Sequence, residues 1–291
     1  RPRIAETAKT LWLIYASLTL LCAFAYWLAG MSPFDAITHS FSTVSIGGFS
    51  THDSSMAYFN SPAVNLITVA FLLISACNYA LHFNAFSNLG KRNIFVSYFR
   101  DPEFRFFMFI QIALVTICFF MLLTNHHFNG TFKNLEQAAF QSVSISTTAG
   151  YTTSSFDQWP LFLPILLLFA SFIGGCAGST GGGLKVIRIL VLSLQGKREL
   201  KRLIHPTLVY PVKLGKRVLD ERVIQSIWAF FSAYLLVFVV CLLGVISCGV
   251  ETFDAFNAVI ACLNNLGPGL GSVSSNFVSI PDSAKWILTL T

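Results

Sequence analysis

The sequence predicts an all-α integral membrane protein built from repeated units, each made of a span, a short helix with a loop, and a second span. Two observations predict this class. Only 11% of the residues are charged and 54% are hydrophobic, whereas soluble domains carry about 25% charged residues. A glycine-centred polar segment also recurs three times between apolar stretches, and crossing a bilayer takes roughly 20 apolar residues.

Six apolar stretches are candidate membrane spans. The last begins near Trp286 and stops at Thr291, and the chain has no initiator Met, so we expect a fragment of a longer protein. Seven cysteines are scattered singly, and we expect them to pack rather than to form disulfides or bind metal. The first five stretches are 11–28, 64–81, 106–123, 161–176 and 224–246.

The basic residues predict the orientation of these spans. Of the 19 Lys and Arg residues, only Lys133 and Lys285 lie outside the N-terminus and the segments 91–105 and 185–222. Under the positive-inside rule those three places are cytoplasmic, and the segments around the recurring glycines enter from the outer side. The net charge of +6 therefore reflects topology, and we expect no nucleic-acid partner.

Three copies of one segment follow these spans. The sequence FDAITHSFSTVSIGGFST (34–51) aligns without a gap with EQAAFQSVSISTTAGYTT (136–153) and FDAFNAVIACLNNLGPGL (253–270). Each copy begins with a helical pattern too short to cross the bilayer and ends in a polar strip. In this register Gly48, Gly150 and Gly267 coincide.

A non-helical strip at membrane depth is tolerated only where protein buries it or where it lines a watery cavity. Around one axis, backbone carbonyls of such strips could replace the water shell of a cation. The partially negative C-terminal ends of the short helices would favour the same charge. Glycine permits the left-handed conformations that such a strip needs. The alternative is that the three glycines only end short helices.

These residues resemble a known family. TAGYT (148–152) resembles the potassium-channel filter signature Thr-Val-Gly-Tyr-Gly, and essentially the whole chain resembles the TrkH family of the Trk/Ktr/HKT superfamily. The resemblance implies four membrane-pore-membrane units in a pseudo-fourfold, potassium-channel-like arrangement. This chain would hold the second unit (1–92), the third (93–200) and the fourth, truncated in its last helix (201–291). The segments that carry the resemblance are RPRIAETAKTLWLIY, IGGFSTHD, FIGGCAGSTGGGLKVIRIL and NNLGPGLG.

The resemblance also implies that potassium is bound by backbone carbonyls of three filter strips, with no covalently bound cofactor. The second glycine of the channel signature is replaced by Ser50 and Thr152 and kept only at Gly269. The alternative of a sodium-conducting or weakly selective transporter therefore remains. The sequence also does not decide between a channel and a proton-coupled symporter. The filter strips are Ile46, Gly47, Gly48 and Phe49; Thr148, Ala149, Gly150 and Tyr151; and Asn265, Leu266, Gly267 and Pro268.

The segment IGGCAGSTGGGLK (173–185) interrupts a span with six glycines, each costing about 1 kcal/mol relative to Ala in a helix. It is not a nucleotide-binding loop, because Leu184 and Val186 stand where Lys and Ser or Thr are required. Close packing of helices through small residues is one interpretation. The resemblance implies another, an intramembrane gate loop under the filter, with Gly174, Gly175, Gly178, Gly181, Gly182 and Gly183.

We expect structural roles for four other polar residues. We expect Asn78 and His82 to hydrogen-bond neighbouring helices, and Asp35 and Asp254 to interact with helix N-termini. The spans offer no convergent nucleophile and base and no metal cluster, so we expect a transporter rather than an enzyme.

The basic segment LQGKRELKRLIHPTLVYPVKLGKR (194–217) could set topology, contact anionic lipid or bind a soluble regulator. The resemblance implies a cytosolic TrkA-type nucleotide-binding ring as that regulator. It further implies a homodimer in the bacterial inner membrane, with the basic loops cytoplasmic.

Overall fold

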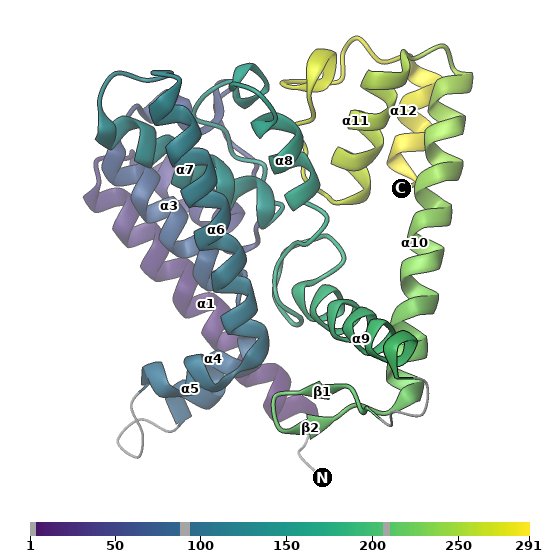
Figure 1. The fold of residues 1–291 in the computed structure, drawn as a ribbon. Helices are drawn as coiled ribbons and strands as arrows, with labels where there is room; N and C mark the ends of the chain where they lie inside the picture. The colour runs from purple at the N-terminus through teal and green to yellow at the C-terminus, as the bar shows by residue number, and fades with distance from the viewer. Residues whose placement is uncertain (1–3, 88–93, 206–209) are drawn as a thin grey trace.

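The computed structural model describes residues 4–87, 94–205 and 210–291, and the chain is predominantly helical (Figure 1). The basic residues Arg1, Arg3, Lys91 and Arg92 lie outside the described residues. The α-helices are α1 (Ile4–Leu28), α2 (Pro33–Val44), α3 (Pro62–Ser75), α4 (Tyr79–Ser87), α5 (Ile94–Arg100), α6 (Pro102–Thr124), α7 (Thr131–Ser146), α8 (Leu163–Ala170), α9 (Val186–Ile204), α10 (Glu221–Ser247), α11 (Thr252–Leu263) and α12 (Asp282–Thr289). Short 3-10 helices occupy Ser55–Phe59, Phe156–Gln158 and Gly271–Val273.

Helices α1, α6 and α10 are long and apolar enough to cross a membrane, which confirms the predicted spans 11–28, 106–123 and 224–246. Helix α6 shows how the sequence starts such a span. The side chain of Asp101 accepts a hydrogen bond from the backbone N–H of Phe104 at 2.8 Å, and Pro102 occupies the first helical turn. Both features are typical helix starts.

The predicted span 64–81 is broken rather than continuous: its two helices together are long and apolar enough to cross a membrane, but they are sharply bent. Helix α3 ends at Ser75, and α4 leaves it at an angle of 90°. The bend is stabilised by the glycine-rich segment, because the Cys176 N–H donates to the Ala76 carbonyl at 2.8 Å and the Tyr79 N–H donates to the Gly178 carbonyl at 3.3 Å. These contacts replace helical hydrogen bonds that a continuous span would make.

Two further differences from the sequence prediction concern the second half of the chain. The apolar stretch 161–176 forms only the short helix α8, and the helix resumes as α9 at Val186. The all-α prediction also omitted a small antiparallel hairpin of β1 (Lys213–Leu214) and β2 (Arg217–Val218). Its turn contains Gly215 with a φ of 60°, a conformation that glycine adopts without steric cost.

The three short helices α2, α7 and α11 pack beside the spans that precede them, α1, α6 and α10. Figure 1 shows this for α7 beside α6 and for α11 beside α10. Their buried apolar side chains fill three cores, one around α1 to α3, one around α6 to α8 and one around α10 to α12. The start of α1, helix α5 and the β1–β2 hairpin lie together at one end of the molecule, and α11 and α12 lie toward the other. The basic segments that the structure describes are thus gathered at one end.

All seven cysteines are free, as the sequence predicted, and Cys22, Cys77, Cys118 and Cys176 are buried. His82 takes the predicted structural role, but within the described residues Asn78 does not bond to a neighbouring helix as predicted. Its side chain instead accepts the N–H of Ala80 at 2.8 Å, at the start of α4. His82 bonds to Tyr98 and to a carbonyl of α3.

Candidate functional site

The three predicted filter strips follow α2, α7 and α11 with one repeated backbone geometry. In the first copy the Gly47 N–H donates to the Ser42 carbonyl at 2.8 Å and the Ile46 N–H donates to the Thr43 carbonyl at 3.1 Å. The same pair of bonds recurs at Ala149 and Thr148, and again at Leu266 and Asn265. This pattern is a Schellman motif, which ends a helix with one left-handed residue.

That left-handed residue is not a glycine in any of the three copies. It is Ile46 (φ 56°), Thr148 (φ 69°) or Asn265 (φ 56°). A side chain in this region costs roughly 1–2 kcal/mol, and such strain is tolerated where the surrounding structure enforces it. Ile46 and Thr148 are therefore held in a conformation that local preference opposes, whereas Asn265 adopts it more readily.

Gly48, Gly150 and Gly267 lie two residues further on, with φ values of 67°, 79° and 91°. They are not the residues that end the helices, so the interpretation of these glycines as helix caps is wrong. Each strip has positive φ at its first and third residues. The alternation of backbone hand that the sequence predicted is therefore present in all three copies.

Consecutive strips approach each other through their backbones. A Cβ atom on Gly48 would lie 1.7 Å from the carbonyl oxygen of Ala149, and one on Gly150 would lie 1.9 Å from that of Leu266. Ala149 and Leu266 occupy the same register position, so the first strip meets the second as the second meets the third. Around Gly267, no described atom lies within 4 Å of such a Cβ. The same contact thus joins the first strip to the second and the second to the third, as expected for strips related by rotation about a common axis.

Each short helix is tied to its own span just before its strip begins. Tyr26 of α1 places its hydroxyl 2.8 Å from that of Thr43. Ser146 donates to Gln111 of α6 at 2.9 Å. In the third copy, Tyr234 of α10 donates to the Asn264 side chain. These buried bonds link the strips to long helices and oppose their displacement.

A second set of bonds joins each short helix to the chain beyond its strip. The Thr51 hydroxyl donates to Asp35 at 2.8 Å, and the Thr153 hydroxyl donates to Gln137 at 2.7 Å. In the third copy, Ser272 donates to Asp254 from both its hydroxyl and its backbone N–H. The role of Asp35 and Asp254 thus goes beyond the predicted interaction with a helix N-terminus.

The sequence analysis did not predict these hydrogen bonds between each short helix and the chain beyond its strip, and it did not single out Gln137. Asp35, Gln137 and Asp254 share one register position in the three aligned copies, which was the available signal. Burial acts to raise the pKa of Asp35, but hydrogen bonds from Ser32 and Thr51 and the neighbouring His52 outweigh it and hold that pKa below its ordinary value. The ionised carboxylate of Asp35, which accepts the hydrogen bond from Thr51, is thereby favoured.

A cavity of about 650 Å³ opens at the end of the strips away from the short helices. All three strips contribute to its wall, and Asp53 and Asp157 add two carboxyl groups. Among the described residues, no cluster of three or more His, Cys, Asp or Glu side chains could hold a metal ion. The arrangement offers backbone oxygens and a mildly acidic entrance to a cation.

The glycine-rich loop, 173–185, touches the ends of all three short helices. Its Thr180 hydroxyl donates to the Val44 carbonyl of α2 at 2.9 Å. Its Gly182 N–H donates to the Thr148 hydroxyl at 2.7 Å. A Cβ on Gly182 would lie 2.2 Å from the Asn264 carbonyl oxygen. The loop therefore lies directly against the inner side of the strips.

Two charged side chains hold the glycine-rich loop in place. Glu103 of α6 is 7% exposed and accepts the Ala177 N–H at 2.6 Å. The Lys185 ammonium donates to the carbonyls of Gly181 and, at 3.3 Å, Ser179. No part of the loop is helical, so the interpretation as a small-residue contact between helices is wrong.

Comparison with known proteins agrees with this geometry. The chain matches the TrkH family, described as a cation transport protein, over residues 1–291. It is 63% identical over 290 residues to the Trk system potassium uptake protein TrkH of Vibrio parahaemolyticus, covering 100% of this chain and 59% of that relative. It is 60% identical over 288 residues to the protein of the same name from Escherichia coli, covering 99% of this chain and 59% of that relative.

A crystal structure of the potassium transporter TrkH from Vibrio parahaemolyticus matches with a TM-score of 0.94 at 62% identity, covering 100% of this chain and 62% of that one. The chain thus spans 59% of the length of the two relatives named above. These matches confirm the resemblance in the sequence and the membrane-transporter fold. The chain belongs to the TrkH family of cation transport proteins.

Proposed function

We propose that this chain supplies three of the strips that line a potassium pathway, and that it contributes to potassium uptake across the bacterial inner membrane. The observation that carries this proposal is the geometry of the strips, which share one alternating backbone and meet each other through one repeated contact. Carbonyl oxygens of 46–49, 148–151 and 265–268 would replace the water shell of the ion. The names of the relatives support potassium as that ion.

The side chains of the strips differ widely, and backbone coordination accounts for this. Ile46, Thr148 and Asn265 share a conformation although an aliphatic, a hydroxyl and an amide side chain have no ligand chemistry in common. Pro268 lacks an N–H but keeps its carbonyl. The C-terminal ends of α2, α7 and α11 point to the strips and add partial negative charge. A membrane potential would drive entry with roughly 2.3 kcal/mol per charge per 100 mV.

The glycine-rich loop is the proposed gate. It lies against the ends of the short helices through Thr180 and Gly182, and hydrogen bonds with Glu103, with Lys185 and with the bend between α3 and α4 also hold it. A non-helical segment with six glycines has the backbone freedom to change shape. Movement of the loop away from the strips would open the pathway.

Helix α9 and the β1–β2 hairpin are the proposed cytoplasmic contact for a TrkA-type nucleotide-binding ring. They carry a dense set of basic residues at the end of the molecule opposite α11 and α12 (Figure 1). The full-length protein would form a homodimer, and residues 1–92, 93–200 and 201–291 would be successive pore units. Arg198 of α9 bonds to Glu221 of α10, which would link this contact to a span.

The proposal is tested with the full-length protein in proteoliposomes. Tracer uptake of potassium and sodium is compared under a potassium-free and a sodium-free internal buffer, with the membrane potential clamped. Uptake of potassium well above that of sodium supports the proposal. Equal uptake of both ions, or faster sodium uptake, favours the weakly selective alternative, and uptake no greater than in empty vesicles contradicts an ion pathway.

A further inference from the structure

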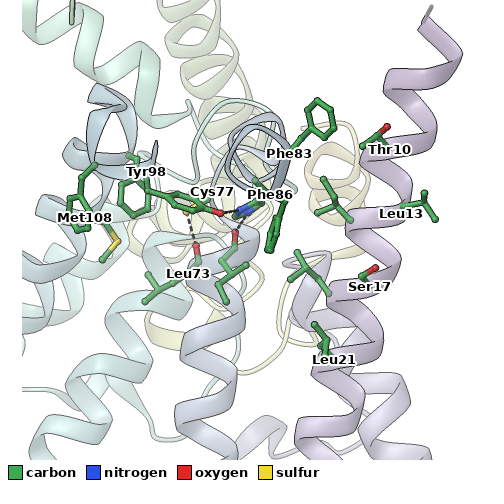
Figure 2. Close-up of a pocket in the computed structure, with 16 residues that line it drawn as sticks. Thr10, Leu13, Ser17, Leu21, Leu73, Cys77, Phe83, Phe86, Tyr98 and Met108 are labelled. Carbon is green, nitrogen blue, oxygen red and sulfur yellow. Dashed lines mark hydrogen bonds between the residues drawn. The ribbon is translucent and has the colours of Figure 1, made fainter. Parts of the chain in front are cut away.

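A second, larger cavity of about 810 Å³ lies far from the strips, beside the bend between α3 and α4 (Figure 2). Figure 2 shows Thr10, Leu13, Ser17 and Leu21 in a row along α1, with Phe83 and Phe86 of α4 facing them. Tyr98 of α5 and Met108 of α6 close the opposite side. Most of the sixteen lining side chains are aliphatic or aromatic.

Apart from the Ser17 hydroxyl, the polar side chains in this wall bond to the protein itself. His82 lies 2.6 Å from the Tyr98 hydroxyl through one ring nitrogen and 2.9 Å from the Ile74 carbonyl through the other. The Cys77 thiol donates to the Leu73 carbonyl, and the Thr10 hydroxyl donates to the Glu6 carbonyl. An occupant of this cavity would therefore meet an apolar surface.

The shape of the cavity matches one leaflet of a bilayer. Thr10 and Leu21 are eleven residues apart on α1, which is about 16 Å along a helix. The hydrocarbon core of a bilayer is about 30 Å thick, so this distance is about half of it. Leu13 (48% exposed), Leu21 (58%) and Phe83 (43%) leave the cavity open at the side of a membrane-spanning helix.

Three basic residues adjoin lining residues of this cavity in the sequence. Lys9 precedes the lining residue Thr10, Arg100 follows Phe99, and Arg105 follows Phe104, and all three basic residues are exposed. The two carboxylates between Arg100 and Arg105 are engaged elsewhere, because Asp101 caps α6 and Glu103 accepts the Ala177 N–H. Clusters of basic residues next to a span attract anionic lipid headgroups.

We propose that this cavity holds an acyl chain of an anionic phospholipid, with the phosphate of the headgroup beside Lys9, Arg100 and Arg105. The apolar wall accepts the chain, its length fits one leaflet, and the basic rim selects the charge of the headgroup. This site does not depend on the proposed ion pathway, since it shares no lining residue with the strips or the glycine-rich loop.

The first experiment is native mass spectrometry of the full-length protein with phosphatidylglycerol or phosphatidylcholine added. Ser17→Trp places a large ring in the cavity, and Leu20→Trp is its control, because Leu20 is 72% exposed and does not line the cavity. We expect one tightly retained phosphatidylglycerol in the wild type and in Leu20→Trp, and at least tenfold weaker retention in Ser17→Trp. Equal retention by both variants would overturn the proposal.

The basic rim is tested with a combined Lys9→Gln, Arg100→Gln and Arg105→Gln variant. We expect its retention of phosphatidylglycerol to fall to the level of phosphatidylcholine. Unchanged preference for phosphatidylglycerol would remove the rim from the proposal and overturn it.

A measurement on the wild type avoids any effect of substitution on folding. Phosphatidylglycerol with a photoreactive group on its acyl chain is cross-linked to the full-length protein, and the modified peptides are mapped. Adducts on residues 13–21 and 83–86 support the site. Adducts confined to other lipid-facing surfaces such as α10 would show that lipid binds only as a general annulus, or that another part of the protein covers the cavity, and either result refutes the proposal.

Discussion

The carbonyl oxygen of Leu266 lies so close to Gly150 that a Cβ atom there would be only 1.9 Å from it. Gly48 has the same relationship to Ala149. Consecutive strips are thus packed backbone against backbone, and Gly48 and Gly150 are needed for the approach as well as for their positive φ. The position of one strip therefore depends directly on the next.

The hydroxyl of Thr180 is expected to hold the glycine-rich loop closed. Thr180→Val keeps the shape of the side chain but removes the donor to the Val44 carbonyl. Losing one such bond costs about 1 kcal/mol, which shifts an equilibrium about fivefold. We expect potassium flux through the full-length protein, without any cytosolic partner, to rise by about that factor. The measurement is tracer uptake into proteoliposomes, normalised to folded protein.

The matched control for this change is Thr38→Val. Thr38 bonds only within α2, to the carbonyls of Phe34 and Asp35. Its flux should equal that of the wild type. A flux of Thr180→Val at or below that of Thr38→Val would mean that the bond does not restrain the loop.

Glu103 is expected to restrain the same loop more strongly. A hydrogen bond to a charged acceptor contributes roughly 1.5–3 kcal/mol, and the Glu103 carboxylate accepts the Ala177 N–H at 2.6 Å. Glu103→Ala should raise resting potassium flux about tenfold or more, and Glu103→Gln, which keeps an acceptor oxygen, should give a smaller increase. Uptake into proteoliposomes measures both. The idea fails if the two folded variants conduct less than the wild type.

The hydroxyl of Tyr26 is expected to stabilise the packing of α1 against α2 and α3. It lies 2.8 Å from the Thr43 hydroxyl and 2.9 Å from that of Thr68, and all three residues are buried. Tyr26→Phe leaves two buried hydroxyls with fewer partners and should cost about 2 kcal/mol, lowering Tm by roughly 5 °C. Thermal unfolding of the detergent-solubilised full-length protein measures the change.

Tyr58→Phe provides the comparison, since Tyr58 is 58% exposed. Its Tm should stay within about 1 °C of the wild type, as most exposed substitutions do. Equal shifts in the two variants would remove any special role for the buried hydroxyl network.

The proposed orientation makes a labelling prediction. A cysteine at Gly196 of α9 should react with an impermeant thiol reagent only from the cytoplasmic side, and one at Asn129 only from outside. Both positions are exposed, and a side chain at Gly196 meets no atom within 4 Å. The unmodified protein sets the background, and the seven cysteines of this chain are buried or half-buried. Labelling of each cysteine from the opposite side would contradict the proposed orientation.

Much of the site could be predicted because it depends on residues that are close together in the sequence. The gap-free alignment of three segments located Gly48, Gly150 and Gly267, and α2, α7 and α11 precede them as expected. The six glycines of 174–183 predicted a break between helices, and α8 and α9 are separated there. Each of these features depends on residues next to each other in the chain.

The features that escaped prediction depend on distant residues. Hydropathy does not report the break within the span 64–81, because the bend depends on the bonds from Cys176 to the Ala76 carbonyl and from Tyr79 to the Gly178 carbonyl. The left-handed conformation of Ile46 also escaped prediction, because a β-branched side chain disfavours that conformation locally. The surrounding fold overrides the preference, and a single sequence does not report that override.

The central claim is that the registered glycines allow the strips to form one potassium-selective path, and the potassium-to-sodium flux ratio of Gly150→Ala tests it most directly. The control is Gly196→Ala, where an added Cβ meets no atom within 4 Å. Both are measured as the full-length protein in proteoliposomes, normalised to folded protein by size-exclusion chromatography. We expect the ratio to fall at least tenfold in Gly150→Ala and to stay at the wild-type value in Gly196→Ala. A folded Gly150→Ala protein with the wild-type ratio would contradict the claim.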